Sequence, residues 1–158
     1  PWRVPETYQR KLLGDSVGAL AYIRSQLRPG DKVLITQPHA KAAYIETGQI
    51  DYEMQIPIIF DFVVLEGGRL VDRATVVPVI TSLEHLKLIC ASHKRLWVAL
   101  NRDRFQSRGI RLQWVYPAAR VELFIRENMQ LVHRTQGWAI FLWDAENGHY
   151  RNFRHVTQ

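Results

Sequence analysis

The stretch KVLITQPHAKAAYIETGQIDY, residues 32–52, decides the fold class of this chain. The apolar, β-branched run at residues 33–36 predicts a buried strand. A polar corner that contains a proline follows, and residues 40–46 predict a short helix that ends at Gly48. Ligands of open α/β sheets bind at corners that follow strands. This corner is therefore the first candidate site, and a purely structural role is the alternative.

Helices and strands alternate on both sides of this stretch. The sequence predicts helices over residues 16–27, 40–46, 82–92 and 117–128, and strands over residues 33–36, 58–65, 95–100, 129–133 and 138–143. Alternation of this kind predicts an α/β fold with a mainly parallel sheet. Short right-handed connections place helices on both faces, so we expect a three-layer Rossmann-like sandwich with an antiparallel edge.

Local signals mark several element ends. The glycines within residues 66–69 predict a hairpin turn, and residues 70–76 are either its returning arm or an irregular excursion. Thr81 and Glu84 have the spacing of a capping box at a helix start. Pro117 suits the first turn of the last helix, where its missing N–H costs nothing.

Length and composition indicate one globular domain. The chain has 158 residues, of which 47% are hydrophobic and 23% are charged, and this is enough for a substantial core. We expect a lead-in at residues 1–13, one domain over residues 14–143 and a polar tail over residues 144–158. No apolar run approaches the roughly 20 residues that span a bilayer. Because the chain begins at Pro1, we expect it to be part of a longer protein.

Apolar surroundings predict that several versatile side chains are structural. Cys90 lies in the apolar pattern of a helix, so we expect a buried, inert thiol. As the only cysteine, it excludes an internal disulfide and a cage of zinc-binding cysteines. Trp97, Trp138 and Trp143 fall in or beside apolar strands, and we expect them in the core.

Motifs for the common cofactors and nucleophiles are missing from the sequence. It contains no GxGxxG or GxxxxGK[ST] loop, no GxSxG elbow and no HExxH pair. The glycines at residues 67 and 68 do not open a helix, so amides at a helix start cannot cradle a phosphate there. We therefore expect no cofactor, no metal and no catalytic residue of a known motif.

Four residues of the opening stretch are candidate contacts to a ligand. His39 follows the corner proline, Tyr44 lies in the short helix, and Asp51 and Tyr52 end the stretch. A histidine after a strand is well placed for a general base, although a capping role is the alternative. Asp51 and Glu53 have strand spacing, but alternation with Tyr52 favours a solvated edge over acid–base chemistry.

The segment after the strand at residues 95–100 is rich in arginine. Arg102, Arg104 and Arg108 are its candidate binding residues, since guanidinium groups suit phosphate and carboxylate. The formal net charge of +6 also favours an anionic partner, such as anionic lipid. Nucleic acid is not expected, because Phe105 is the only aromatic residue in this segment. The alternative is an exposed loop with salt bridges.

Several motifs occur together in one order. PGDKVLI at residues 29–35 follows a helix, and a proline corner, Tyr44 with Gly48, and IDY at residues 50–52 come next. A capped helix, KRLWVAL at residues 94–100, the arginine segment, a helix and two apolar strands follow. This order resembles the C-terminal extracytoplasmic domain of GT-C type membrane glycosyltransferases, which include protein O-mannosyltransferases and the aminoarabinose transferase of lipid A.

The resemblance implies a role that is accessory to catalysis. The whole enzyme would transfer a sugar from a polyprenyl-phosphate donor, and its catalytic acids would lie in another part of the polypeptide. This domain would bind the acceptor or cover the membrane active site on the periplasmic face of the inner membrane. Its partners would be the transmembrane part of the same chain and anionic lipid or the polyprenyl-phosphate sugar.

Two alternatives from other functional classes remain open. One is a free-standing Rossmann-like binding or interaction module. The other is a small enzyme that uses His39 and Asp51. A fold alone does not choose among these functions, because one architecture supports many chemistries.

Overall fold

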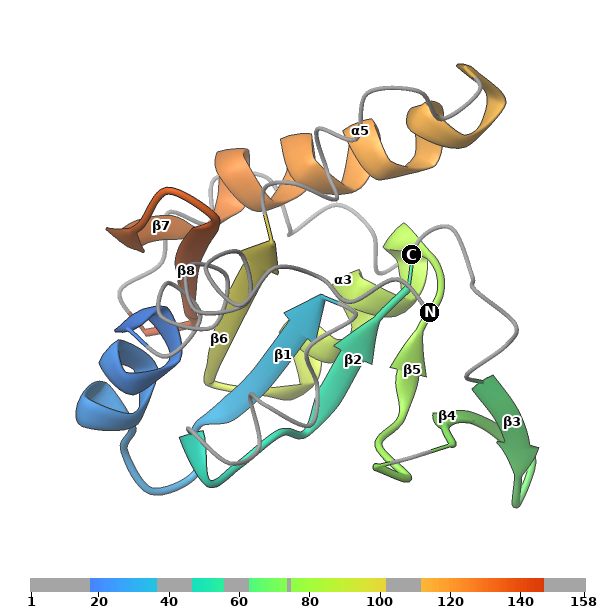
Figure 1. Ribbon diagram of the computed structural model, residues 1–158, viewed down its shortest axis with the longest axis horizontal. Coiled ribbons are helices and arrows are strands. Elements are labelled where there is room, and N and C mark those ends of the chain that lie inside the picture. Colours follow the sequence, from blue (N-terminus) through green and yellow to red (C-terminus); the bar gives the residue numbers. More distant parts are fainter. Residues whose placement is uncertain (1–17, 37–46, 56–62, 74, 102–111, 147–158) are drawn as a thin grey trace, which may run out of the picture.

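The computed structural model describes residues 18–36, 47–55, 63–73, 75–101 and 112–146 (Figure 1). Its helices are residues 18–26, α3 (Leu83–Ser92) and α5 (Leu112–Asn128). The strands of its larger sheet are β1 (Lys32–Thr36), β2 (Tyr52–Met54), β5 (Val79–Ile80), β6 (Arg95–Asn101), β7 (Gln130–Arg134) and β8 (Trp138–Asp144). The helix expected at residues 40–46 lies outside these ranges, and so do residues 58–62 of the strand expected at residues 58–65.

The larger sheet has six strands in the order β5-β2-β1-β6-β8-β7. The pairs β5–β2, β2–β1 and β1–β6 are parallel. Strand β8 runs antiparallel to both of its neighbours, β6 and β7. The prediction of a mixed α/β fold with a mainly parallel sheet is therefore confirmed, and the last two strands pair as expected.

A separate two-stranded sheet lies beside β5 (Figure 1). It consists of β3 (Val63–Glu66) and β4 (Arg69–Asp72), which form an antiparallel hairpin. Gly67 and Gly68 adopt φ values of 54° and 79° in its turn, which glycine accommodates without the steric cost of a Cβ. The predicted turn is confirmed. Of the two alternatives for the residues after the turn, the returning arm is the one observed, as β4, and the hairpin is separate from the main sheet.

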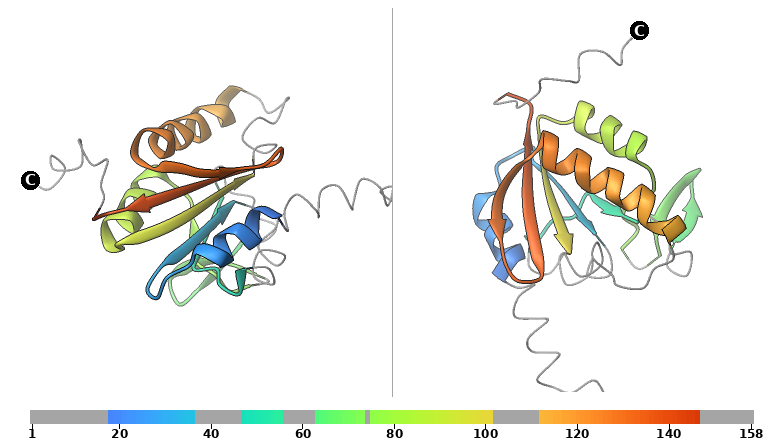
Figure 2. Two further views of the ribbon diagram at one scale, coloured as in Figure 1. Left: turned by 90° about the vertical axis from the view of Figure 1, so that its left-hand side faces the viewer. Right: turned by 90° about the horizontal axis from the view of Figure 1, so that it is seen from above.

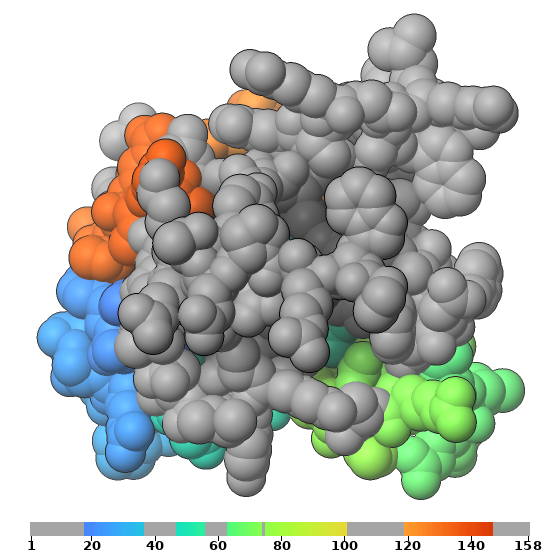
Figure 3. Space-filling model, viewed as in Figure 1, coloured from blue at the N-terminus to red at the C-terminus, as the bar shows by residue number. Residues whose placement is uncertain are grey.

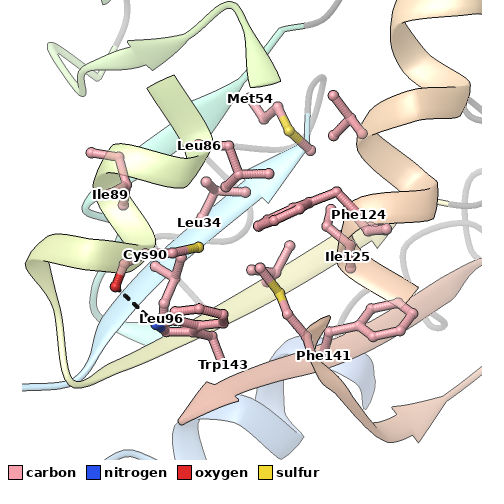
Figure 4. Packing of buried hydrophobic residues seen from close by; sticks show 14 of the residues in the cluster. Leu34, Met54, Leu86, Ile89, Cys90, Leu96, Phe124, Ile125, Phe141 and Trp143 are labelled. Carbon is pink, nitrogen blue, oxygen red and sulfur yellow. Dashed lines mark hydrogen bonds between the residues drawn. The ribbon is translucent and has the colours of Figure 1, made fainter. Parts of the chain in front are cut away.

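Apolar side chains cover both faces of the main sheet. On one face, α3 and α5 pack over Leu34 and its neighbours, with Phe124 between them (Figure 4). On the other face, the helix at residues 18–26 contributes Ile23, which packs with Val33 and Ile35. Neighbouring residues of β1 enter different clusters because successive side chains of a strand point to opposite faces. Figure 2 shows helices on the two sides of the sheet.

The predicted core positions of three tryptophans and the cysteine are confirmed. Trp97, Trp138 and Trp143 are buried, as is Cys90. The Trp143 indole N–H donates a hydrogen bond of 2.9 Å to the Cys90 carbonyl oxygen (Figure 4). Burial raises the pKa of the Cys90 thiol to about 12. The thiol is thus protonated and unreactive at neutral pH, since the thiolate is the nucleophile.

Two helix starts differ from the predictions. The N-cap of α3 is Ser82, one residue after Thr81, and its hydroxyl oxygen accepts a 3.1 Å hydrogen bond from the His85 N–H. Helix α5 begins at Leu112, so Pro117 lies in its second turn at the cost of one backbone hydrogen bond. Within the described ranges, none of the helices combines the length and apolar character that a membrane span requires.

Candidate functional site

A topological switch point lies between β1 and β6. The chain passes from β1 to β2 on one side of β1, and later returns from β5 to β6 on the other side. Ile35 of β1 is opposite Glu53 on one flank and Ala99 on the other. The Thr36 hydroxyl donates a 3.4 Å hydrogen bond to the Ala99 carbonyl oxygen at this end. Open α/β sheets bind ligands beyond the carboxyl ends of strands at such a point.

Five of the seven candidate residues follow, in the sequence, the two strands that flank this switch point. His39 and Tyr44 follow the end of β1, and Arg102, Arg104 and Arg108 follow the end of β6. All five lie outside the described residues. The strand order nevertheless brings the two segments out of neighbouring strands at the same edge. The sequence placed each segment after a strand but did not show that the two strands are adjacent.

Buried polar side chains mark the carboxyl end of β2. Glu53 is fully buried, and its Oε1 accepts a 2.9 Å hydrogen bond from the Gln55 side-chain amide. The prediction that Glu53 belongs to a solvated edge is wrong, because β2 is an interior strand between β5 and β1. A buried carboxylate is expensive unless it is compensated. The bond to Gln55 contributes to this compensation, so Glu53 belongs to the buried polar end of β2.

Asp51 lies at the opposite, amino-terminal edge of the strands. Its carboxylate accepts hydrogen bonds of 2.9 Å from the Val33 N–H and 2.6 Å from the Gln49 side-chain amide. It also forms a 3.0 Å ion pair with Lys32. These contacts tie the start of β1 to the segment before β2. They give Asp51 a structural role, on the edge away from the end of β1 that precedes His39.

Tyr52 is paired with a histidine that the sequence did not single out. The phenol oxygen lies 2.8 Å from Nε2 of His93, and their ring centroids are 5.7 Å apart. His93 caps the C-terminus of α3. Burial raises the pKa of Tyr52 above its usual value, while nearby Lys32 opposes this shift. The phenol is therefore protonated at neutral pH, and the pair joins β2 to α3.

The variant Tyr52→Phe is expected to lower the free energy of unfolding by about 1 kcal/mol, since it removes one partly buried hydrogen bond. Urea denaturation followed by circular dichroism measures the change. Tyr22→Phe is the control, because the Tyr22 ring stacks on His133 at 4.3 Å and its hydroxyl makes no hydrogen bond to other described residues. Equal losses in the two variants would show that the Tyr52–His93 bond contributes nothing.

A second network at the amino edge also escaped the sequence interpretation. The buried Asp31 carboxylate accepts hydrogen bonds from Nε of Arg95 at 2.9 Å and from the Trp97 indole at 2.7 Å. Arg95 also pairs with Asp144 at 3.2 Å. The network joins the starts of β1 and β6 to the end of β8. Apart from the spacing of PGD before an apolar run, the sequence gives no signal for it.

The two edges of the sheet thus differ in chemistry. The amino edge is held by hydrogen bonds between described side chains, and these bonds are structural. The carboxyl edge is the origin of both segments with candidate ligand contacts. Among the described residues, no three His, Cys, Asp or Glu side chains gather to hold a metal ion. The switch-point edge is therefore the candidate functional site.

No family model, no curated protein and no solved structure matches this chain. The class defined by the structure itself is an α/β domain with a mainly parallel six-stranded sheet and a separate antiparallel hairpin.

Proposed function

We propose that this chain is the extracytoplasmic domain of a membrane glycosyltransferase that uses a polyprenyl-phosphate sugar. Its role is accessory to catalysis, through acceptor binding or coverage of the membrane active site. In this proposal the domain lies on the periplasmic face of the inner membrane and adjoins the transmembrane part of the same polypeptide. Its fold is a three-layer Rossmann-like sandwich. The resemblance of PGDKVLI and KRLWVAL to GT-C domains supports this assignment.

The adjacency of β1 and β6 is the observation that carries the binding role. Because these strands are parallel neighbours at a switch point, the segments after them leave from one edge of the sheet. Arg102, Arg104 and Arg108 in the second segment provide guanidinium groups, which bind phosphate with directed hydrogen bonds. The net charge of +6 adds long-range attraction for an anionic lipid substrate.

Binding of a polyprenyl-phosphate sugar tests the proposal directly. The full chain is mixed with this lipid in vesicles of phosphatidylcholine, and the bound fraction is measured by co-sedimentation. The variant Arg102→Gln/Arg104→Gln/Arg108→Gln is expected to bind about tenfold more weakly, because charge-assisted hydrogen bonds are lost. Binding of the unmodified chain should also weaken as salt is added.

The matched control is Arg24→Gln/Arg28→Gln/Arg120→Gln, which removes the same charge from exposed positions elsewhere. Equal loss in both triple variants would mean that net charge alone drives binding, and the proposed site would be wrong. No binding by the unmodified chain would favour a free-standing module or a small enzyme. The gene upstream of Pro1 gives an independent test, since several apolar segments of about 20 residues are expected there.

A further inference from the structure

Exposed apolar residues concentrate in the segment around the β3–β4 hairpin. Six large hydrophobic side chains of the described residues are exposed: Val64, Leu65, Val76, Leu88, Leu123 and Leu131. Three of them lie within residues 63–77. Leu65, two residues before Gly67 of the turn, is 72% exposed, more than any of the others. Single exposed hydrophobic residues are ordinary, but their grouping on a projecting element indicates an interaction surface.

The hairpin projects from the β5 end of the main sheet (Figure 1) and forms the lower right corner of the molecule in Figure 3. It is a sheet of its own, and an isolated bridge between Val71 and Pro78 links it to the segment before β5. The residues around the turn between β3 and β4, from Val64 to Arg69, are all exposed. A two-stranded ribbon gains little stability by itself. The exposed apolar side chains at its tip therefore do not serve the stability of the fold, and we infer that they contact a partner.

The loop after the hairpin holds a strained, exposed valine. Val76 has φ of 59°, although it is β-branched, and it is 58% exposed. Its N–H donates to the Asp72 carbonyl oxygen at 2.8 Å. The Asp72 carboxylate accepts from the Thr75 N–H and hydroxyl at 2.8 and 3.0 Å. Strain at an exposed position that packing does not require is typical of functional surfaces.

Exposed charges around the hairpin favour an anionic partner. Arg69 and Arg73 are exposed. Asp72 is buried, and its carboxylate accepts a hydrogen bond from Thr75 in the loop that follows. Glu66 is the only exposed acid of the described hairpin, and the strand register places it opposite Arg69. The exposed charged side chains of residues 63–73 are thus two arginines and one glutamate, which leaves one positive charge in excess on the surface beside the apolar tip.

We propose that the β3–β4 hairpin is a contact to an anionic lipid surface, with Val64 and Leu65 in the bilayer interface and Arg69 and Arg73 on lipid phosphates. Val64 and Leu65 are neighbours in one strand, so they point to opposite faces of the ribbon. A bilayer surrounds an inserted tip on both faces, whereas a protein partner covers one. Apolar anchors with flanking cations are the chemistry of peripheral membrane binding.

This inference deepens the proposed function, because a domain that covers a membrane active site needs a contact that orients it on the bilayer. It uses residues different from those proposed to bind the sugar donor. Loss of vesicle binding in hairpin variants, with binding of polyprenyl-phosphate sugar in phosphatidylcholine preserved, would separate the two sites. Loss of binding to the polyprenyl-phosphate sugar in the arginine-segment variant, with binding to anionic vesicles preserved, would separate the two sites equally well.

Site-specific labelling tests the contact. Leu65→Cys in the full chain is labelled with an environment-sensitive dye and mixed with vesicles of equal parts phosphatidylglycerol and phosphatidylcholine. The native Cys90 is buried, with its thiol pKa raised to about 12, so the dye reacts at the new cysteine. A blue shift of the dye emission is expected with these vesicles and not with phosphatidylcholine alone. Leu123→Cys on α5, where Leu123 is 55% exposed, is the matched control and should show no shift.

Affinity measurements complete the test. Co-sedimentation with the anionic vesicles is expected to weaken five- to tenfold in Leu65→Ser, since about three buried carbon atoms are lost from a partly inserted side chain. Arg69→Gln and Arg73→Gln should each weaken it about fivefold at low salt. Leu123→Ser should leave it unchanged. Equal dye shifts at both labelled positions, or unaltered binding of Leu65→Ser, would overturn the proposal. A shift at residue 65 that depends on protein concentration without vesicles would instead identify an interface between copies.

Discussion

The variant Asp31→Ala is expected to lower the free energy of unfolding by about 3–4 kcal/mol, because it breaks a buried charge network from one side. The Asp31 carboxylate accepts from Arg95, from the Trp97 indole and from the Arg28 backbone N–H at 3.1 Å. After its removal, Arg95 retains only its ion pair with Asp144 among the described acids. The Trp97 N–H then lies buried without an acceptor, which adds a further desolvation cost.

Urea denaturation measures this loss as a lower midpoint with an unchanged slope. Asp31→Asn retains one acceptor oxygen and should lose about half as much, because the shape and one hydrogen bond survive. The control is Glu146→Ala, which removes an exposed ion pair with Lys94 and should cost less than about 0.5 kcal/mol. If Asp31→Ala and Glu146→Ala lose the same free energy, the network at the amino edge does not stabilise the fold.

The variant Trp143→Ala is expected to cost about 4 kcal/mol, since it leaves a large cavity in the main apolar cluster. Trp143 lies opposite Leu96 in the β6–β8 pairing, and it packs beneath α3 and α5. Its indole also bonds the Cys90 carbonyl oxygen near the end of α3. The substitution therefore removes packing and a helix-to-sheet hydrogen bond together. A domain with a total stability of about 5–15 kcal/mol would lose a large share of it.

Thermal and urea unfolding, followed by far-ultraviolet circular dichroism, measure the effect without relying on tryptophan emission. Trp143→Phe retains most of the apolar volume and should cost about 1–2 kcal/mol, mainly for the lost hydrogen bond. Leu123→Ala is the exposed control and should change stability by less than about 0.5 kcal/mol. A loss in Trp143→Phe as large as that in Trp143→Ala would show that the hydrogen bond, and not the packing, is decisive.

Elements with strong local patterns were predictable from the sequence. The apolar runs of β1, β6 and β8 and the helical stripe of α3 identified these elements, with bounds within one or two residues. The short strands were not predictable in this way. β2 and β5 have three and two residues, too few for a periodic pattern. Each is stabilised by parallel pairing with its neighbours, and this information lies in other parts of the chain.

The candidate site was predictable only in fragments. Positions after strands identified His39 and the arginine segment as candidates. Sequence spacing also joined Asp51 to the corner, whereas its contacts lie at the other edge of the sheet. The buried state of Glu53 depends on its strand being interior. Strand order is a long-range property, so no local pattern could separate these residues into two groups.

The sequence by itself determined the α/β class, the buried tryptophans and cysteine, the hairpin turn and the basic charge. These properties depend on residue type and on neighbours a few positions away, which set backbone conformation and apolar faces. The tertiary structure decided which strands are adjacent, and thus that the segments after β1 and β6 share one edge. It also decided that Asp31 binds Trp97, 66 positions further along the chain. Such partners depend on the packing of the whole core. A buried charge needs hydrogen bonds, and only the fold determines which donors lie near it.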